Sequence, residues 1–227
     1  MAEQLVFELA PAEPPSFSNF VPGRNAEAVA RLVASARGET ADRSILLWGA
    51  EGAGRSHLLR AAVAASTRPA RYVAGPAELE AGPIHGPALI AVDDVDRADA
   101  DAQGRLFTLF NRLQDAGGLL MTAAAMPPGR LALRDDLRTR LGSGLVYEVQ
   151  PLRDEEKPDA LERYARDRGF RLSAEVIAYL LAHGRRDMGT LVATLAALDR
   201  HSLAEKRPIT VPMLRQWLQR DLPWRGS

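Results

Sequence analysis

The sequence contains no cysteine in 227 residues. Structural disulfides, thiolate metal sites and cysteine nucleophiles are therefore excluded, and the composition fits a reducing compartment. The four histidines, His57, His85, His183 and His201, do not share the spacing of a metal site.

Net charge and long apolar runs are also lacking. The 29 Lys and Arg residues balance the 29 Asp and Glu residues, so the chain has no general attraction to nucleic acid. No apolar run has the length needed to span a bilayer, and the acidic amino terminus lacks the pattern of a signal peptide. We expect a cytoplasmic protein with no membrane partner. Because only Lys157 and Lys206 among the 29 basic residues are Lys, an Arg where a motif has Lys is weaker evidence than usual.

Apolar runs and helical patterns alternate up to residue 150. Five compact apolar runs predict buried strands, at residues 44–49, 71–74, 88–92, 119–122 and 145–149. Helical patterns occupy residues 25–36, 56–65, 101–116 and 133–141. The alternation predicts an α/β domain over residues 16–150, with a parallel five-stranded sheet covered by helices on both faces.

The segments on either side of this domain have different patterns. After Pro151 the strands end, and helical patterns at residues 158–168, 174–182, 188–198 and 211–219 predict a small helical lid domain over residues 151–227. Ser173 and Thr210 are suitable N-caps there. Residues 1–15 lack both patterns and end in two prolines, so they predict an extended arm.

The strongest local signal is the glycine-rich segment from Gly49 to Ser56, which lies between an apolar strand and a helix. A phosphate-binding loop needs this placement, because glycines let backbone amides point at the phosphates and the helix N-terminus favours an anion. Ser56 would reach nucleotide-bound Mg²⁺. Arg55 stands where the pattern has Lys, and its planar guanidinium is bulkier than an ammonium. The alternative is a glycine-rich turn with no ligand.

Two carboxylates, Asp93 and Asp94, follow the apolar run at residues 88–92. In a P-loop protein Asp93 would hold Mg²⁺ through water, and Asp94 lies where an ATPase places the carboxylate that polarises attacking water. Because Asp is one methylene shorter than the usual Glu, nucleotide binding is better supported than fast hydrolysis. The alternative is a strand end followed by an acidic loop.

Several motifs in one order resemble the AAA+ module of the bacterial initiator DnaA. They are Phe-Ser-Asn-Phe-Val-Pro-Gly at 17–23, Gly-Arg-Ser-His-Leu-Leu at 54–59, Phe-Thr-Leu-Phe-Asn-Arg-Leu at 107–113, Pro-Pro at 127–128 and Asp-Leu-Arg-Thr-Arg-Leu at 136–141. From Gln4 to about Leu218 the chain resembles more closely the Hda family, DnaA-related proteins that inactivate the initiator. The helix-turn-helix domain of DnaA would begin where this chain ends, so we expect none.

The resemblance implies functions for particular residues. Arg140 would be an arginine finger that enters the nucleotide site of a neighbouring DnaA molecule; a solvated or salt-bridged Arg is the alternative. Phe20 and the two residues after it would line an adenine pocket, or Phe17 and Phe20 would only pack the arm on the core. The expected nucleotide-binding residues are Phe20, Val21, Pro22, Gly49, Gly52, Ala53, Gly54, Arg55, Ser56, His57, Asp93 and Asp94.

Two further segments would bind partners. Phe107 and Asn111 lie beside the apolar stripe of their helix and would face DnaA; a half-buried Phe at the margin of the stripe is the alternative. The arm resembles a peptide that binds the β sliding clamp of DNA polymerase III, unless it docks on the protein's own core. Its contact residues would be Gln4, Leu5, Phe7 and Leu9.

Two nucleotide-sensing residues of the family are missing. The lid Arg would fall at Gly189, with Arg185 or Arg186 as substitutes, and residues 122–126 carry no acidic or amide side chain where the first sensor is expected. These departures leave few residues that could support ATP hydrolysis by the chain itself. We therefore expect bound ADP with Mg²⁺ rather than ATP turnover, with ATP as the other ligand.

Together these features predict a negative regulator of replication initiation rather than an enzyme. It would bind ADP, dock on the DNA-loaded clamp, and stimulate hydrolysis of DnaA-bound ATP through Arg140. DNA and the nucleoid would be reached only through these partners, and a homodimer stays open. The alternatives are an autonomous AAA+ ATPase of the helicase-loader type and a nucleotide-free adaptor.

Overall fold

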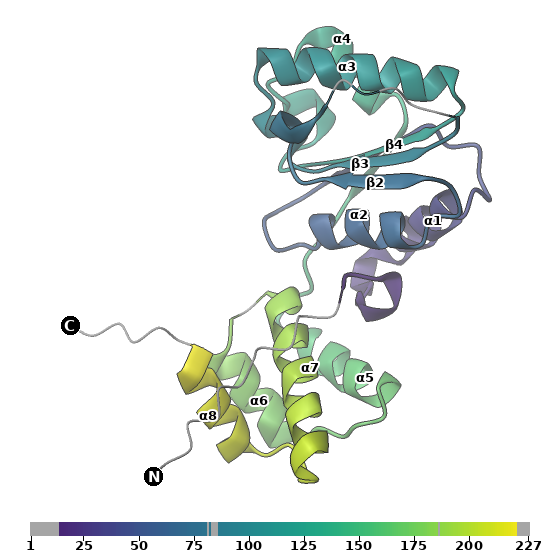
Figure 1. Cartoon of the computed structure of the whole chain (residues 1–227). Helices are drawn as coiled ribbons and strands as arrows, with labels where there is room; N and C mark the ends of the chain where they lie inside the picture. Colours follow the sequence, from purple (N-terminus) through teal and green to yellow (C-terminus); the bar gives the residue numbers. More distant parts are fainter. Residues whose placement is uncertain (1–13, 81, 83–85, 186, 222–227) are drawn as a thin grey trace, which may run out of the picture. The chain divides into compact units, whose positions relative to one another are not determined.

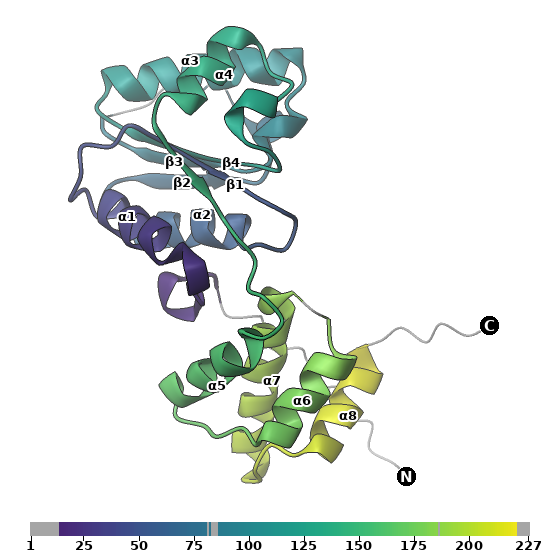
Figure 2. The ribbon, with the colours of Figure 1, turned by 180° about the vertical axis from the view of Figure 1, so that it is seen from behind.

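The computed structural model describes residues 14–80, 82, 86–185 and 187–221. The chain divides into two compact units: the α/β unit, residues 15–152, and the lid unit, which begins at Arg153. Figures 1 and 2 show the ribbon of both units from opposite sides. The expected clamp-binding residues Gln4, Leu5, Phe7 and Leu9 lie outside the described residues.

The α/β unit is built on a five-stranded sheet in which every neighbouring pair is parallel, in the order β2-β3-β4-β1-β5. The prediction of a parallel five-stranded sheet is confirmed. The strands are β1 (Ser44–Trp48), β2 (Ala70–Val73), β3 (Leu89–Val92), β4 (Leu119–Ala124) and β5 (Leu145–Glu148).

Helices cover both faces of this sheet because its strands alternate apolar side chains to the two sides. Ile45 and Leu47 of β1 pack with the first pair of helices, α1 (Ala26–Ala36) and α2 (Arg55–Ala64). Leu46 packs with the second pair, α3 (Ala100–Asp115) and α4 (Asp135–Gly142). Figure 1 shows α1 and α2 on one side of the sheet and α3 on the other. The glycine-rich loop and Arg140 therefore belong to opposite layers.

Short turns connect these elements. The 3-10 turns are η1 (Phe17–Asn19), η2 (Gly23–Asn25), η3 (Pro76–Glu78), η4 (Val95–Arg97) and η5 (Pro128–Arg130). The Asn25 side chain joins the first and last parts of the unit. It donates to the Gln150 carbonyl oxygen and accepts from the Gln150 amide, each at 2.8 Å.

The lid unit contains α5 (Lys157–Asp167), α6 (Ala174–His183), α7 (Met188–Glu205) and α8 (Val211–Asp221). Its core holds Leu161, Leu180, Leu195 and Leu214. Ser173 caps α6 as predicted, since its hydroxyl accepts from the Val176 amide at 3.3 Å. Among the described residues, no helix combines the length and apolar character needed to cross a membrane.

Candidate functional site

The glycine-rich loop connects β1 to α2 and has a backbone that only glycine accepts at two places. Gly52 and Gly54 have φ values of 75° and 100°, in the left-handed region. A Cβ atom on Gly54 would lie 2.6 Å from Cε2 of Phe20, and one on Gly49 would collide with the Val149 carbonyl oxygen. The loop thus lies against Val149, the residue after β5, and against the Phe20 ring. Neither Gly49 nor Gly54 has room for a side chain.

The first turn of α2 presents backbone donors that have no partner among the described residues, at the end of this loop. The helix begins at Arg55, and its N-cap Gly54 has no side chain to accept from the first amides. The first helical bond of the turn runs from the Leu58 amide to the Gly54 carbonyl oxygen at 3.0 Å. The amides before Leu58 and the positive end of the helix dipole are suited to an anion such as phosphate.

Arg55 supplies an independent sign of an anion at this loop. Its side chain is half-buried, and its Nη1 atom is buried without a hydrogen-bond partner among the described residues. An unpaired buried guanidinium nitrogen is costly, and a phosphate oxygen would satisfy it. The residues of the loop therefore fit a nucleotide phosphate, with Arg55 in the place of the usual Lys. Ser56, the next residue, is exposed and open to a ligand or a metal ion.

Asp93 lies immediately after β3 and is only 3% exposed. Its Oδ2 accepts from the Tyr72 hydroxyl at 2.7 Å, and its Oδ1 accepts from the Asp94 amide at 3.0 Å. Burial, together with the neighbouring Asp93 carboxylate, raises the pKa of Tyr72 to about 12, so the hydroxyl keeps its proton and remains a donor. The carboxylate proposed to hold Mg²⁺ is thus fixed from two sides.

Asp94 is held differently from its neighbour. It lies in the left-handed region with φ of 48°, and its Oδ2 is 3.3 Å from Nη1 of Arg97. Since it is half-buried rather than buried, Asp94 remains more accessible than Asp93. Tyr72 was not among the predicted site residues. Its contact with Asp93 arises because β2 lies beside β3, an order that the sequence pattern does not contain.

Phe20 and His57 meet above the loop. Their ring centroids are 5.4 Å apart, and Nε2–H of His57 donates to the Ser16 carbonyl oxygen at 2.9 Å. Burial lowers the pKa of His57, so the neutral ring is favoured. Phe20 also packs on the core of the α1–α2 side, which corresponds to the packing alternative from the sequence. Val21 and Pro22, the other expected adenine contacts, are half-buried beside it.

Arg140 lies on α4 and contacts aromatic rings. Its Cζ is 4.6 Å from the centroid of Phe107 and 5.6 Å from that of Phe110. Two other arginines near this helix are paired with carboxylates: Arg134 with Asp136 and Arg138 with Asp135. Among the described residues Arg140 has no such partner, and its side chain is half-buried, so the solvated alternative stays beside the arginine finger.

Phe107 and Asn111 lie one turn apart on α3, and both are half-buried. The two residues that were predicted to face a partner therefore differ in their contacts. Phe107 contacts Arg140, whereas Asn111 has no described contact with it. The half-buried state that the sequence left open for Phe107 is what the structure shows.

Comparisons with known proteins agree with this geometry. A family model described as "Hda, lid domain" matches residues 154–218, which form the lid unit. Domain III of the Thermotoga maritima replication initiation protein DnaA has a similar structure, with a TM-score of 0.70 and 18% identity over 95% of this chain and 100% of that one. The chain therefore has the AAA+ fold, and its residues 154–218 are similar to the Hda lid domain.

Other solved structures share the same AAA+ fold. AMPPCP-bound DnaA from Aquifex aeolicus gives a TM-score of 0.63 at 21% identity, over 87% of this chain and 71% of that one. The RuvB Holliday junction branch migration motor of Thermotoga maritima gives 0.61 at 16% identity, over 92% and 72%. At these identities the likeness shows the fold, and the fold supports several different activities.

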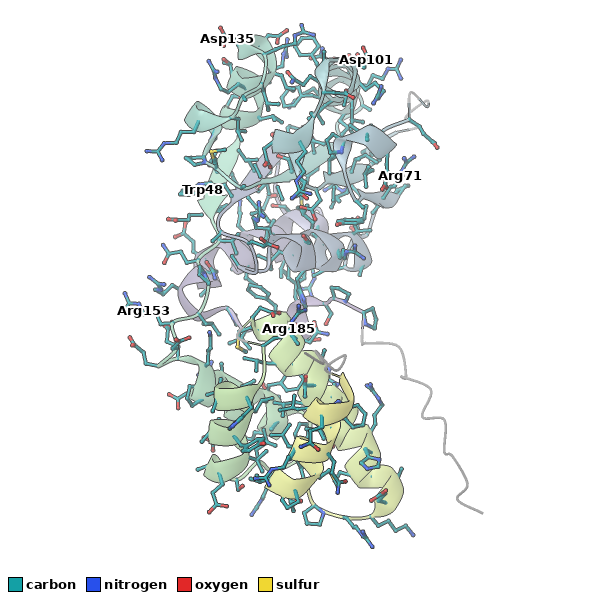
Figure 3. All side chains as sticks on the ribbon, turned by 90° about the vertical axis from the view of Figure 1, so that its left-hand side faces the viewer. Trp48, Arg71, Asp101, Asp135, Arg153 and Arg185 are labelled. Carbon is teal, nitrogen blue, oxygen red and sulfur yellow. The ribbon has the colours of Figure 1, made fainter. Side chains whose placement is uncertain are left out.

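Neither of the two expected sensor positions carries a charged or amide side chain. Gly189 is exposed in the first turn of α7, and Arg185, labelled in Figure 3, is exposed in the lid unit; Arg186 lies outside the described residues. At the other position β4 continues through Ala124, and the Ala125 amide donates to Oδ1 of Asp96 at 3.1 Å. Asp96, which the sequence pattern did not single out, thus holds the end of the strand where the first sensor was expected.

Within the described residues, no three His, Asp or Glu side chains are grouped to hold a metal ion. Ser56 and Asp93 alone would be too few ligands for a resident metal. They fit Mg²⁺ that arrives with a nucleotide and takes its other ligands from phosphate and water.

Proposed function

We propose that this AAA+ protein binds an adenine nucleotide and stimulates hydrolysis of DnaA-bound ATP, with Arg140 acting in trans. The observation that carries the proposal is the state of Arg140. Its charge is not neutralised by a carboxylate among the described residues, whereas Arg134 and Arg138 are paired at 2.7 and 2.6 Å. A guanidinium whose donors are free can stabilise the charge that develops on a transferring phosphoryl group.

The position of Arg140 supports action on another molecule. It lies on α4, which packs on the sheet face opposite α2 and its phosphate-binding loop. Asp135, labelled in Figure 3, marks the start of this helix. An arginine in that layer is better placed to serve a neighbouring subunit's nucleotide than its own.

The protein's own nucleotide would be ADP, bound for structure and regulation. The buried Nη1 of Arg55 and the free amides of α2 supply phosphate contacts. The poor sensor positions and the Tyr72 bond to Asp93 argue against fast turnover.

Clamp binding would come from residues 4–9, which precede the described chain. The support is the pattern of Gln4 followed by the apolar residues Leu5, Phe7 and Leu9. An extended peptide with alternate apolar anchors suits a groove on a partner. DNA would then be reached through the clamp, in agreement with the zero net charge of the chain.

The test measures hydrolysis of DnaA-bound ATP in the presence of DNA-loaded clamp. We expect Arg140→Ala to lose stimulation by about 10³-fold, the lower end of the effect of an arginine finger in trans. Arg138→Ala is the matched control, because Arg138 lies on the same helix and is paired with Asp135. Equal activity of Arg140→Ala and the parent would remove the arginine-finger assignment.

Two further measurements examine the remaining parts of the proposal. Deletion of residues 4–9 should abolish stimulation with clamp present while leaving the thermal unfolding of the α/β unit unchanged. Chromatography of the small molecules released by denaturing the purified protein should detect ADP. Steady ATP turnover by the isolated chain would instead indicate an autonomous AAA+ ATPase, and the absence of nucleotide would indicate an adaptor.

A further inference from the structure

Two aromatic side chains of α3 form a surface for Arg140. Phe107 and Phe110 are three residues apart, so they lie on one face of the helix. Phe110 is 4% exposed and belongs to the core, whereas Phe107 is half-buried at its margin. Arg140 is nearer to Phe107, at 4.6 Å from its centroid, than to Phe110, at 5.6 Å. Of the two rings, Phe107 is thus the more accessible and the nearer to Arg140.

The backbone that carries Arg140 is rigidly packed. Leu137 and Leu141, which lie on either side of it in α4, are fully buried against the same core as Phe110. The residues that flank Arg140 therefore fix its Cα, while its long side chain retains several rotatable bonds. Contact with an aromatic face restricts those bonds.

An aromatic face suits an arginine finger better than a carboxylate does. A carboxylate would occupy the N–H donors and offset the charge, as Asp135 does for Arg138. A ring face attracts the guanidinium through its π-electrons and leaves in-plane N–H groups available to a phosphate. The contact therefore orients the group without consuming the donors that act on the phosphoryl group.

We propose that Phe107 is a positioning residue for Arg140, holding the guanidinium ready to enter the ATP site of the partner. This inference rests on the function proposed above and adds to it. It also differs from the expectation that Phe107 itself faces DnaA. A residue that contacts the partner affects the concentration needed for stimulation, whereas a residue that orients the finger affects the maximal rate.

The deciding variants differ in whether position 107 carries a ring. Phe107→Leu keeps an apolar side chain but has no aromatic face, and Phe107→Tyr keeps the face. We expect Phe107→Leu to lower the maximal rate of DnaA-bound ATP hydrolysis roughly two- to fivefold, the size of a partly exposed cation–π contact. The half-saturating concentration should stay within about twofold, and Phe107→Tyr should recover the parental rate.

Arg134 provides a matched control for this variant. Its Cζ also lies over the Phe107 ring, at 5.7 Å, but its Nη2 is paired with Asp136 at 2.7 Å. Arg134→Ala should therefore leave the maximal rate unchanged. In the Arg140→Ala background, Phe107→Leu should cause no further loss of the maximal rate, because the contact through which Phe107 acts is already absent.

A spectroscopic readout is independent of DnaA. The Nε–H resonance of Arg140, assigned by its loss in Arg140→Ala, should carry an upfield ring-current shift in the parent. Phe107→Leu should remove most of that shift, and Phe107→Tyr should keep it. If thermal unfolding shows that Phe107→Leu does not fold, Phe107→Met takes its place in every measurement.

The outcomes separate this inference from the function on which it rests. Full activity of Arg140→Ala would overturn the proposed function, whatever the spectra show. Loss of activity in Arg140→Ala with a parental maximal rate in Phe107→Leu would overturn the positioning inference alone. A raised half-saturating concentration with an unchanged maximal rate would assign Phe107 to direct partner contact instead. Equal losses in Phe107→Leu and Phe107→Tyr would exclude the aromatic face as the cause.

Discussion

The Tyr72 hydroxyl donates a hydrogen bond of 2.7 Å to Oδ2 of Asp93, and so joins the edge strand β2 to the acidic end of β3. The Cζ atom of Arg60 lies 4.3 Å from the centroid of the same tyrosine ring. Asp93 is 3% exposed, and burying a carboxylate is costly unless hydrogen-bond donors satisfy its oxygens. Tyr72 therefore both stabilises Asp93 and occupies one of the oxygens that Mg²⁺-bound water would use.

Replacing Tyr72 with Phe should separate these two effects. We expect Tyr72→Phe to lower the free energy of unfolding by about 1.5–3 kcal/mol, the range for a hydrogen bond to a charged group. The freed oxygen should also strengthen the dependence of nucleotide binding on Mg²⁺. Urea unfolding and ADP titrations with and without Mg²⁺ measure the two quantities.

The matched control for this prediction is Tyr147→Phe on β5. Tyr147 is half-buried like Tyr72, and no hydrogen bond from its hydroxyl to a described residue is present. Its replacement should change the free energy of unfolding by less than about 0.5 kcal/mol. Equal effects of the two substitutions would show that the Tyr72 bond to Asp93 adds nothing to stability.

The stability of the α/β unit should depend on pH through His57. Burial lowers the pKa of His57 below its ordinary value of 6.5, so the folded chain resists protonation of this ring. Well above pH 6.5 His57 is neutral in both states, and it does not affect the free energy of unfolding. As the pH falls through 6.5 the unfolded chain gains a proton that the folded chain does not, so the free energy of unfolding should fall as pH falls.

Urea unfolding at pH 7.5, 6.5 and 5.5 measures this effect. His57→Gln keeps an N–H group for the Ser16 carbonyl oxygen but cannot be protonated, so it should lose part of the acid dependence. His183→Gln is the control, because His183 is exposed in the lid unit. Parallel curves for the parent and His57→Gln would exclude His57 as the source.

Local patterns predicted the elements of the α/β unit closely, because buried strands are compact apolar runs. One boundary error lies in β4, which was predicted to end at Thr122 and continues through Ala124. Alanine carries little strand preference. Its place in the strand is set by pairing with β1, where Ala124 lies opposite Trp48 and accepts from the Gly49 amide at 3.3 Å. Such pairing is not written in the local sequence.

The candidate site was predictable only where its residues are consecutive. The loop from Gly49 to Ser56 is one such run, and its glycines are in the backbone states that the pattern requires. Tyr72 and Arg140 depend on neighbours that are distant in sequence. The order of β2 and β3 brings Tyr72 to Asp93, and the packing of α4 on α3 brings Arg140 to Phe107.

Gly54 should tolerate a side chain poorly. Its φ of 100° disfavours any other residue, and a Cβ would lie 2.6 Å from Cε2 of Phe20. We expect Gly54→Ala to lower the free energy of unfolding by about 1–3 kcal/mol and to weaken ADP binding. Gly129→Ala is the control, because a Cβ at that position would have no other atom within 4 Å, and the substitution should change neither quantity.

A double variant distinguishes the two causes at Gly54. Adding Phe20→Leu would relieve the collision with the ring but would leave the backbone strain. If Gly54→Ala lost no stability in either background, the left-handed loop would not persist in solution.

Replacing Arg55 should raise the stability of the nucleotide-free protein and weaken ADP binding. Opposite effects of this kind mark a ligand site. Its buried Nη1 has no partner among the described residues, so the nucleotide-free protein bears the cost of an unpaired donor. We expect Arg55→Met to raise the free energy of unfolding of the nucleotide-free protein by up to about 1 kcal/mol, because the side chain is only half-buried. ADP affinity should fall about 10- to 100-fold, as expected for loss of a charge-assisted hydrogen bond.

Urea unfolding after removal of nucleotide and calorimetric titration with ADP measure the pair of quantities. Arg55→Lys should recover part of the affinity, since an ammonium restores the charge without the planar fork. Arg130→Met, at an exposed position of η5, should alter neither stability nor affinity. A gain in stability with unchanged ADP affinity would mean that the buried guanidinium does not meet the nucleotide. A loss of stability would mean that Arg55 supports the fold itself, through the packing of its half-buried side chain.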